Sequence, residues 1–537
     1  MQFSKLLCAL VLAVTAFAAD TGIWKIAPPP PASWQRDRVA DLSARRKALM
    51  DQIGDRAVLI LYAAEPRNYA GDVEWPFRQE NDFFYLTGLT QPGATLVLAP
   101  GAGTIREMVF IPHSNPAQES WTGHMITAAE ARETSGIQNV FEGTQFNGFL
   151  AALIPRARAI LTAPAEGVGG GVPSGPGGGA NPTPPVNTPA WTTEFAKPIA
   201  YSAKEELQLY MILPARANAV EYRREQEFAG KLASVGPGVN IKDATTLINN
   251  LRRVKSPREI DILQHAVDIT AEAFQRASAA AIPGAPEYEI QAQFEFTFLR
   301  RNGHWGYPCI VGSGNNATTL HYQSNKDTMK AGDLLLIDDA AEFDQYSADV
   351  TRTIPVSGKF TREQADIYRL VWEAQQAGFA MARPGHAASG GPDSIQGAAN
   401  EVFKQGLFKL GLITDPHSDA QMRIWFNHGI SHGIGLNVHD PGGRELQPGM
   451  VITVEPGLYF RPDALRNLPQ TPEMEKFAAA IRLVFEKYQG IGVRIEDDVL
   501  ITTGDPRIIS AAIPSKLEEV EAGIAKLRQA VKTTPMP

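Results

Sequence analysis

Acidic residues follow directly after short apolar runs at several places in this chain, and this pattern limits the folds that it can adopt. Residues 334–337 form one such run, which ends in Asp338 and Asp339, and Asp349 follows 11 positions after Asp338 in a second predicted strand. An apolar run of about four to eight residues predicts a buried strand, and a hairpin can bring the carboxylates of Asp338 and Asp349 together. A single aspartate at the end of a strand is most often a turn cap, so this pair decides nothing alone.

A second constraint is the clustering of histidines. Three of the ten histidines in the chain, His428, His432 and His439, lie within 12 residues. The glycine and serine residues around them leave room beside the imidazole rings. A lone histidine is usually a structural residue, but three in one glycine-rich stretch favour a functional site.

Two glutamates complete the pattern. Residues 450–454 predict a strand that ends at Glu455, and Glu496 lies in another predicted strand. Since side chains alternate along a strand, Glu496 should point away from Ile495 and to the same side as Arg494. An acid on an inner strand is costly unless it is paired or bound to a metal, although either glutamate taken singly is better explained as a solvated strand end.

Taken together, these side chains favour a site for two divalent cations. Four carboxylates and an imidazole are donors that suit hard or borderline ions, and the charge of four carboxylates balances that of two divalent cations. Without metal, the same cluster would repel itself and its pKa values would rise.

Composition and charge exclude several classes of protein. The 537 residues are 44% hydrophobic and 20% charged, which excludes a wholly disordered chain, a collagen and a polytopic membrane protein. The net charge of -8 comes without a basic block, so the footprint of a nucleic-acid-binding protein is absent. Of the two cysteines, Cys8 lies in a segment expected to be removed, and we expect Cys309 to be a buried small apolar residue.

Residues 1–18 are typical of a secretory signal peptide. Lys5 supplies the positive charge, residues 6–18 are an almost unbroken apolar run, and residues 16–18 read Ala-Phe-Ala, a cleavage signal. We expect cleavage, export to the periplasm or the medium, and no membrane attachment afterwards. The alternative is an N-terminal anchor that is never cut.

An N-terminal α/β domain is expected over residues 36–240. A helix from about residue 36 should carry Arg45, Arg46 and Lys47 on its solvent-facing side, and apolar runs predict strands at residues 57–62 and 94–98. Within this domain, residues 167–189 contain eight glycines and six prolines. Such a segment cannot bury enough apolar surface to offset its ordering entropy, so we expect a flexible insertion at the surface.

A second domain, of α+β type, is expected over residues 245–520. Ser256, Thr361 and Ser515 are each followed three residues later by glutamate or glutamine. This spacing is typical of a capping box, so each should start a helix. The first helix should run to about residue 281 and the second to about residue 382, where Pro-Gly pairs follow.

Four motifs occur in order along this second domain: LIDDAAEFDQYSADVTRT at residues 336–353, HGISHGIGLNVHD at 428–440, TVEPGLYF at 453–460 and GVRIEDD at 492–498. Together they resemble the metallopeptidases of the pita-bread fold, which include methionine aminopeptidase, aminopeptidase P, prolidase and creatinase. Residues 307–322 are also typical of that superfamily, and residues 77–93 resemble its aminopeptidase P and prolidase branch. The resemblance implies an α/β N-terminal domain plus an α+β C-terminal pita-bread (creatinase/aminopeptidase) domain, in a homo-oligomer, either dimer or tetramer.

The resemblance implies that five residues hold two divalent metal ions. Asp338 would bind one ion and Glu455 and His432 the other. Asp349 and Glu496 would bridge both. Members of the family usually use manganese or cobalt, so we expect Mn²⁺, with Co²⁺ or Zn²⁺ as alternatives.

The resemblance also implies the substrate, a peptide with proline at its second position, whose N-terminal Xaa-Pro bond is hydrolysed by a metal-bridging hydroxide. Glu455 would shuttle the proton, and His321 and His439 would contact the substrate near the scissile carbonyl. His428 would line the pocket for proline, and Arg494 would order the metal-binding carboxylates. A bond before proline lacks an amide N–H and has a fixed backbone, so a shaped pocket for the ring would provide selectivity.

Departures from the family pattern bear on specificity. Asp339 stands where the family usually has a small or apolar residue, and because it should point away from Asp338 we expect it to leave the site unchanged. The long interval from Glu455 to Glu496 resembles prolidase. Against this, only five residues separate Asp440 from Leu446, where prolidases have a longer segment with an arginine that grips the dipeptide carboxylate, and Arg444 is the only basic candidate there. We favour an Xaa-Pro aminopeptidase. A prolidase and an inactive binding protein of the same fold are the alternatives.

Overall fold

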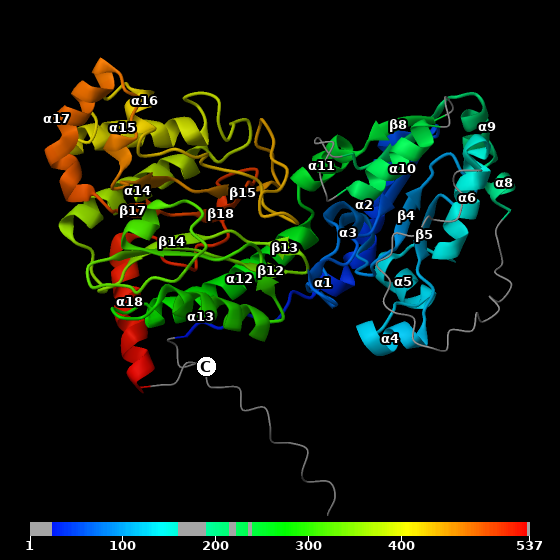
Figure 1. Cartoon of the computed structure of the whole chain (residues 1–537), viewed down its shortest axis with the longest axis horizontal. Coiled ribbons are helices and arrows are strands. Elements are labelled where there is room, and N and C mark those ends of the chain that lie inside the picture. Colours follow the sequence, from blue (N-terminus) through cyan, green and yellow to red (C-terminus); the bar gives the residue numbers. More distant parts are fainter. Residues whose placement is uncertain (1–23, 159–189, 214–221, 235–238, 534–537) are drawn as a thin grey trace, which may run out of the picture. The chain divides into compact units, whose positions relative to one another are not determined.

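The computed structural model describes residues 24–158, 190–213, 222–234 and 239–533. Their contacts divide the chain into two compact units (Figure 1), residues 32–252 and residues 253 onward together with those up to Pro31. The expected signal peptide (residues 1–18) and the glycine- and proline-rich insertion (residues 167–189) lie outside the described residues.

The boundary between the units follows Arg252, later in the chain than the 240–245 boundary expected from the sequence. Helix α11 (Thr245–Arg253) carries Arg252, whose guanidinium donates a 2.6 Å hydrogen bond to Asp82. Both side chains are buried, so this charge-assisted bond fastens the end of the helix to the first unit.

A six-stranded mixed sheet, with strand order β6-β5-β4-β1-β7-β8, forms the centre of the first unit. The strands of this unit are β1 (Ala57–Tyr62), β2 (Asn68–Ala70), β3 (Val73–Glu74), β4 (Thr95–Leu98), β5 (Glu107–Ile111), β6 (Asn139–Glu142), β7 (Leu207–Met211) and β8 (Val239–Asp243). The strands expected at residues 57–62 and 94–98 are therefore confirmed.

Helices cover both faces of this sheet. They are α1 (Ser33–Arg36), α2 (Arg38–Ile53), α3 (Asn81–Thr87), α4 (Pro116–Thr122), α5 (Ala128–Ser135), α6 (Phe146–Leu153), α8 (Trp191–Glu194), α9 (Ala196–Ala203), α10 (Arg223–Ala233) and α11. Helices α2, α3 and α5 lie on one face, and α6, α8 and α9 on the other (Figure 1). All six residues of β1 are buried as a result, which explains why that strand reads as an unbroken apolar run.

The helix expected from about residue 36 is α2, but the prediction that its arginines face solvent is wrong. Arg45 donates a 3.0 Å hydrogen bond to the carbonyl of Tyr85, and Arg46 donates one of 2.8 Å to the carbonyl of Leu86. Both arginines are buried, whereas Lys47 is exposed. The last carbonyls of α3 lack partners within that helix and carry partial negative charge, so they attract the two guanidinium groups.

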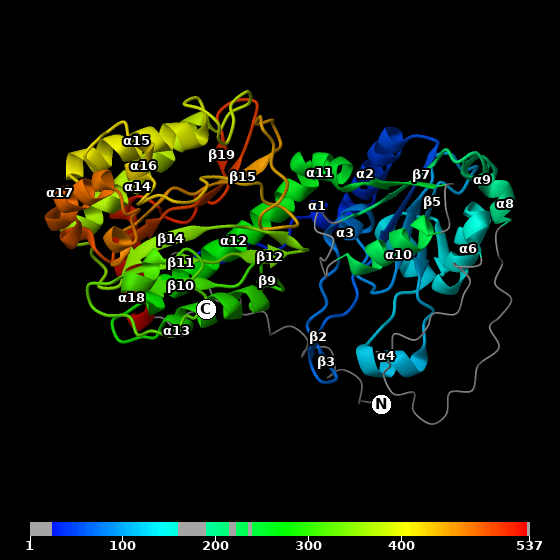
Figure 2. The ribbon, with the colours of Figure 1, turned by 45° about the horizontal axis from the view of Figure 1, so that its top comes forward.

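In the second unit, short sheets lie between two layers of helices, α12 and α13 on one side and α14 and α15 on the other (Figure 2). The helices are α12 (Pro257–Ala280), α13 (Glu287–Arg300), α14 (Arg362–Met381), α15 (Ile395–Leu410), α16 (Asp419–Met422), α17 (Pro472–Tyr488) and α18 (Leu517–Thr533). The expected capping boxes of Ser256 and Thr361 are confirmed at the starts of α12 and α14, and α18 is the expected terminal helix.

The strands of this unit pair mostly as antiparallel neighbours. They are β9 (His304–Trp305), β10 (Ile310–Ser313), β11 (Leu334–Asp338), β12 (Ala341–Phe343), β13 (Tyr346–Ser347), β14 (Thr351–Pro355), β15 (Val451–Val454), β16 (Gly457–Tyr459), β17 (Gly492–Arg494), β18 (Asp497–Leu500) and β19 (Arg507–Ile508). In one sheet β11 lies between β10 and β14, and in another β18 lies between β15 and β19.

Two acidic residues lie beside strands rather than within them, contrary to the sequence prediction. Asp349 precedes β14 by two residues, and Glu496 lies between β17 and β18. The chain changes partner at that point, because β17 pairs with β16 whereas β18 pairs with β15. The backbone N–H of Glu496 instead donates to the carbonyl of Thr351, at 3.0 Å, which holds the glutamate beside β14.

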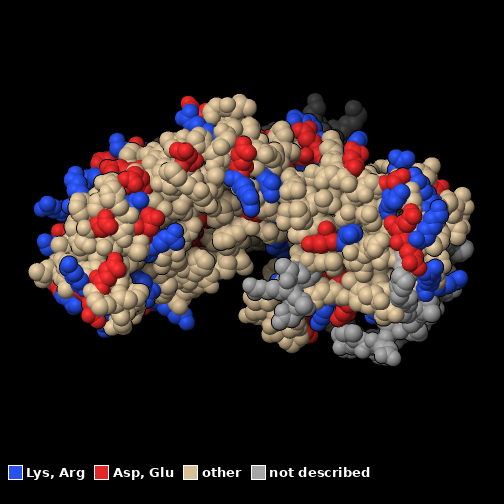
Figure 3. Space-filling view, turned by 90° about the horizontal axis from the view of Figure 1, so that it is seen from above, with Lys and Arg blue, Asp and Glu red and all other residues tan. Residues whose placement is uncertain are grey.

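Three further observations concern burial and surface charge. Cys309 is buried, as expected. Among the described residues, no helix combines the length and the apolar character needed to cross a membrane. Acidic and basic side chains are interspersed over the face drawn in Figure 3, in keeping with a sequence that lacks a basic block.

Candidate metal centre

The structure brings all five predicted metal ligands together. The first, Asp338, is the last residue of β11, and its neighbours come from four other segments of the chain. Three sets of side chains each offer ligand atoms within 4.8 Å of one another: Asp338, Asp349 and Glu496; His432, Glu455 and Glu496; and Asp349, His432 and His439. Since each set shares a residue with the others, the sets form one continuous cluster.

Two residues from other segments orient the carboxylate of Asp338. The hydroxyl of Tyr307 donates a 2.7 Å hydrogen bond to one oxygen, and the guanidinium of Arg494 pairs with the other. Arg494 also donates to Thr351, whose hydroxyl in turn donates a 2.6 Å hydrogen bond to Glu496. Two of the predicted ligands are thus held by one buried chain of hydrogen bonds.

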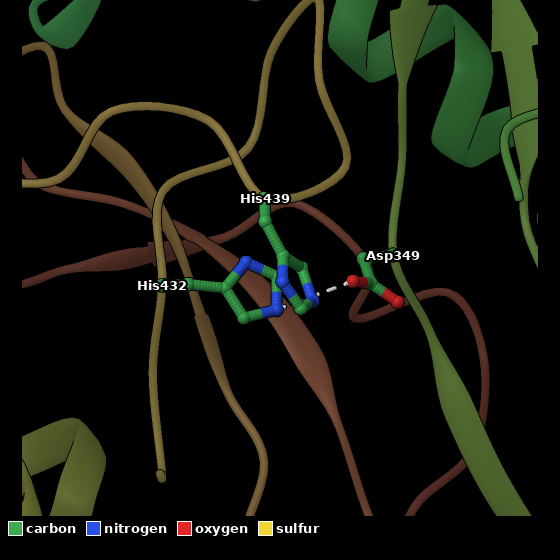
Figure 4. Close-up of side chains that lie close together, drawn as sticks. All are labelled: Asp349, His432 and His439. Carbon is green, nitrogen blue, oxygen red and sulfur yellow. Dashed lines mark ion pairs between the residues drawn. The ribbon is translucent and has the colours of Figure 1, made fainter. Parts of the chain in front are cut away.

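His432 faces the acids through one ring nitrogen. Its Nε2 lies 3.4 Å from a carboxylate oxygen of Asp349 (Figure 4). The same nitrogen lies 3.4 Å from a carboxylate oxygen of Glu455. Its Nδ1 lies 3.0 Å from the carbonyl of Gly433, a geometry that places the proton on Nδ1 and leaves the Nε2 lone pair directed at the cluster. The backbone N–H of His432 donates to the Thr453 hydroxyl, which fixes the loop against β15.

The other three predicted histidines lie around this cluster. The ring of His439 is 4.0 Å from that of His432, and it belongs to one of the three sets of ligand atoms (Figure 4). His428 has Nδ1 at 3.6 Å from Glu455 and Nε2 at 2.9 Å from the hydroxyl of Tyr459. His321 is exposed, and its charge acts on both His428 and His439.

The protonation of the site follows from its burial. Burial, and then the charges of neighbouring acids, raise the pKa of Asp349 and Glu455 well above their ordinary values and that of Glu496 to about 8. Burial lowers the pKa of His432 to about 4 and that of His428 to about 3. Carboxylates that repel one another beside a neutral imidazole are the donor set that two divalent cations would stabilise, so these residues fit such ions.

Several residues at the site were not assigned from the sequence. Tyr307, Thr351 and Tyr459 contact predicted ligands or Arg494 directly. Arg352 donates to the carbonyl of Glu496 and to the carboxylate of Asp497, both at 2.6 Å. All four lie within the motifs or the segment 307–322 named above. Their position close to predicted ligands in the sequence could therefore have identified them as residues of the site.

Two residues discussed for specificity lie away from the ligand cluster. Asp339 is completely buried beside the thiol of Cys309, and burial raises the pKa of its carboxyl well above its ordinary value. Burial therefore favours the neutral, protonated form of the Asp339 carboxyl over a solvated carboxylate. Arg444 is exposed on the loop before β15.

Two family models match the chain. Residues 261–503 match "Metallopeptidase family M24", and residues 42–161 match "Aminopeptidase P, N-terminal domain". The chain is 31% identical to the Xaa-Pro aminopeptidase of Escherichia coli over 91% of its own length and 98% of that protein. It is 30% identical to the Xaa-Pro aminopeptidase of Haemophilus influenzae over 90% of its own length and 96% of that protein.

Two solved structures that resemble this chain are also aminopeptidases P. The structure is similar to that of E. coli aminopeptidase P with the inhibitor Pro-Leu, with a TM-score of 0.70 and 30% identity, covering 91% of this chain and 99% of that one. It is also similar to zinc-substituted E. coli aminopeptidase P in complex with product, with a TM-score of 0.71. The expected fold, an N-terminal aminopeptidase P-type domain followed by a pita-bread domain, is confirmed.

Proposed function

Since the chain belongs to metallopeptidase family M24 and is a metallo-exopeptidase that cleaves Xaa-Pro bonds, we propose that it is an aminopeptidase acting through two divalent cations. The proposed ligands are Asp338, Asp349, His432, Glu455 and Glu496. The observation that carries this proposal is the continuous cluster in which these five side chains offer ligand atoms within 4.8 Å of their neighbours.

Different residues of the site would have different roles in the hydrolysis. Two bound divalent cations would supply a hydroxide nucleophile near neutral pH and polarise the scissile carbonyl. The carboxylate of Glu455, 3.4 Å from His432 and 3.6 Å from His428, is positioned to take up a proton and return it to the leaving nitrogen. His439 and His321, at the open side of the cluster, would donate to the carbonyl oxygen as it gains charge.

We place the proline ring of the substrate beside His428. This imidazole contacts the ring of Phe426 edge-on, with centroids 4.8 Å apart, and its Nε2 lies beside the Tyr459 hydroxyl. The three rings give an apolar wall with a polar tip, which suits a pyrrolidine ring better than an extended side chain.

The test compares an Xaa-Pro-Yaa tripeptide with an Xaa-Pro dipeptide, using the mature protein loaded with Mn²⁺. We expect chelator-sensitive release of Xaa from the tripeptide. An Xaa-Ala-Yaa tripeptide serves as the matched control and should be cut far more slowly, because it lacks the ring. Cleavage of the dipeptide alone would replace this proposal by a prolidase. Cleavage of neither proline peptide would reject the specificity for proline, and the metal content of the protein would then decide between a peptidase of another specificity and a binding protein.

We propose Mn²⁺ as the physiological ion. Four of the five proposed ligands are carboxylates, whose hard oxygen atoms suit Mn²⁺, although an imidazole also accepts Co²⁺ or Zn²⁺. Metal analysis of protein purified without added metal distinguishes these ions.

We also propose that the protein is exported, because residues 1–18 have the charge, apolar length and Ala-Phe-Ala end of a signal peptide. N-terminal sequencing of the protein recovered from an exporting culture should find a start at Ala19. A sequence that still begins at Met1 would contradict export by cleavage and favour the uncleaved anchor.

A further inference from the structure

One glutamine of α14 contacts the backbone beside two of the proposed metal ligands. Gln375 is completely buried in α14, a helix of the layer that covers one side of the short sheets (Figure 2). Its amide nitrogen Nε2 donates hydrogen bonds of 3.1 Å to the carbonyl of Val454 and 3.1 Å to the carbonyl of Ile495. These two residues immediately precede Glu455 and Glu496 in the chain.

The same nitrogen also contacts the residue that follows Glu496. It donates a 3.0 Å hydrogen bond to the carboxylate of Asp497, so the residues directly before and after Glu496 both bind one amide group. The backbone carbonyls can only accept hydrogen bonds, which assigns the nitrogen of the amide, and not its oxygen, to this side. An amide nitrogen carries two hydrogens, so one of them is shared between two acceptors.

A donor is required at this place because the chain changes its strand partner there. Ile495 and Glu496 lie between β17, which pairs with β16, and β18, which pairs with β15. The carbonyl of Ile495 is therefore outside both strand pairs, and a buried carbonyl without a donor costs free energy. Gln375 supplies the donor from α14, and its bond to Val454 ties the end of β15 to the same amide group.

Two further features indicate that the fold keeps this contact in spite of its cost. The other amide atom of Gln375, Oε1, is buried and accepts no hydrogen bond from the described residues, a cost that an apolar side chain would avoid. Gly378 lies three residues later on the same side of α14, where a Cβ atom would come within 3.0 Å of the Val454 side chain. The glycine thus lets the helix approach β15 closely.

We propose that Gln375 is a positioning residue that sets the separation of the Glu455 and Glu496 carboxylates, and with it the affinity of the site for divalent cations. This role rests on the function proposed above and deepens it. Glu455, Glu496 and His432 offer ligand atoms within 4.8 Å of one another. Because one amide binds the backbone beside both glutamates, neither segment can shift without lengthening one of its hydrogen bonds.

The test is Gln375→Met, which keeps the length of the side chain and removes the N–H donors. The dissociation constant for Mn²⁺, measured by calorimetry on the full mature chain, should rise about 10- to 100-fold, as is usual when a group that orients metal ligands is lost. At saturating Mn²⁺, kcat for an Xaa-Pro-Yaa tripeptide should fall by about tenfold, while KM stays within about twofold because the buried amide contacts no substrate. Gln376→Met is the matched control. Gln376 is only partly buried and lies on another side of the helix, so this variant should match the wild type.

A second variant keeps the amide and moves the helix. Gly378→Ala adds a methyl group against Val454, so it should weaken Mn²⁺ binding in the same direction as Gln375→Met, but by less. It also provides the test if Gln375→Met does not fold, which thermal unfolding of the metal-free protein reveals.

The outcomes separate this role from the proposed function. A folded Gln375→Met protein that loses thermal stability but keeps the wild-type Mn²⁺ affinity and kcat would overturn the positioning role and leave the proposed function in place. A wild-type chain that binds Mn²⁺ but does not cut the tripeptide would reject the function, and the Mn²⁺ affinities of the variants would still decide the role of Gln375. A wild-type chain that binds no Mn²⁺ would overturn both.

Discussion

Replacing Glu455 by alanine is expected to abolish hydrolysis of Xaa-Pro-Yaa tripeptides while the protein stays folded. The substitution removes a proposed metal ligand and the group positioned to carry the proton. Loss of a general acid–base group alone costs about 10²- to 10⁴-fold in rate, and weaker metal binding adds to this. Stability should be preserved, because the variant removes one of several buried acids whose mutual repulsion raises their pKa values in the metal-free site.

The measurement is kcat/KM for the tripeptide, with metal content and thermal unfolding recorded on the same samples. Glu455→Gln separates the two roles, since it keeps the volume but cannot accept the proton. Glu486→Ala is the matched control, because Glu486 is exposed on α17. Wild-type hydrolysis by the Glu455→Ala variant would reject the assignment of Glu455 as both ligand and proton carrier.

The metal-free protein is expected to lose stability as the pH rises from about 6.5 to about 8. Glu496 titrates near 4.5 when unfolded, and burial raises its pKa to about 8 in the fold. Between these values the folded state keeps a proton that the unfolded state has released, so the stabilisation present at low pH is lost as pH rises. Asp349 and Glu455, whose pKa values are also raised, act in the same direction.

The histidines act in the opposite direction, but at lower pH. The lowered pKa values of His428, about 3, and His432, about 4, lie below the 6.5 of an unfolded histidine. The free energy of unfolding that these two histidines contribute is complete above pH 6.5. It is lost as the pH falls toward their lowered pKa values. Between about pH 6.5 and 8 the buried carboxylates set the sign of the effect. Glu80 and Glu225 in the first unit, whose pKa values burial raises to about 8 and about 7, act in the same direction as those of the site.

Denaturant unfolding of chelator-treated protein at pH 6.5 and at pH 8 measures this effect. Mn²⁺ at a thousandfold excess over its Kd should raise stability by about 4 kcal/mol at either pH. At one fixed Mn²⁺ concentration the gain should be larger at pH 8, because the ligands give up fewer protons there and Kd is lower. Glu496→Gln should reduce the pH dependence of the metal-free protein, because it removes one of the buried acids with a raised pKa and leaves Asp349 and Glu455 in place. A metal-free protein whose stability is constant or rises over this window would contradict the electrostatic account of the site.

Local patterns in the sequence were sufficient to predict where many helices and strands lie. The capping boxes at Ser256 and Thr361 locate the starts of α12 and α14 because a cap and its helix are formed by neighbouring residues. The apolar run at residues 57–62 predicts β1 because a strand covered on both faces admits few polar side chains. The four motifs, at residues 336–353, 428–440, 453–460 and 492–498, contain every residue that the structure brings into the cluster.

Contacts between distant parts of the chain determine the features that local patterns did not predict. Arg45 and Arg46 are buried because the carbonyls at the end of α3, 40 positions along the chain, need donors. Glu496 leaves its predicted strand because β17 and β18 pair with different strands, and Tyr307 reaches Asp338 only through the pairing of β10 with β11.

Residue type and close neighbours were therefore enough to indicate which side chains could do the chemistry and which short segments carry them. The folded chain was needed to show which carboxylate oxygens converge and which side chains orient them. Those properties depend on contacts between segments far apart in the chain, such as Arg494 and Asp338, which are 156 positions apart, and no local pattern encodes such a contact.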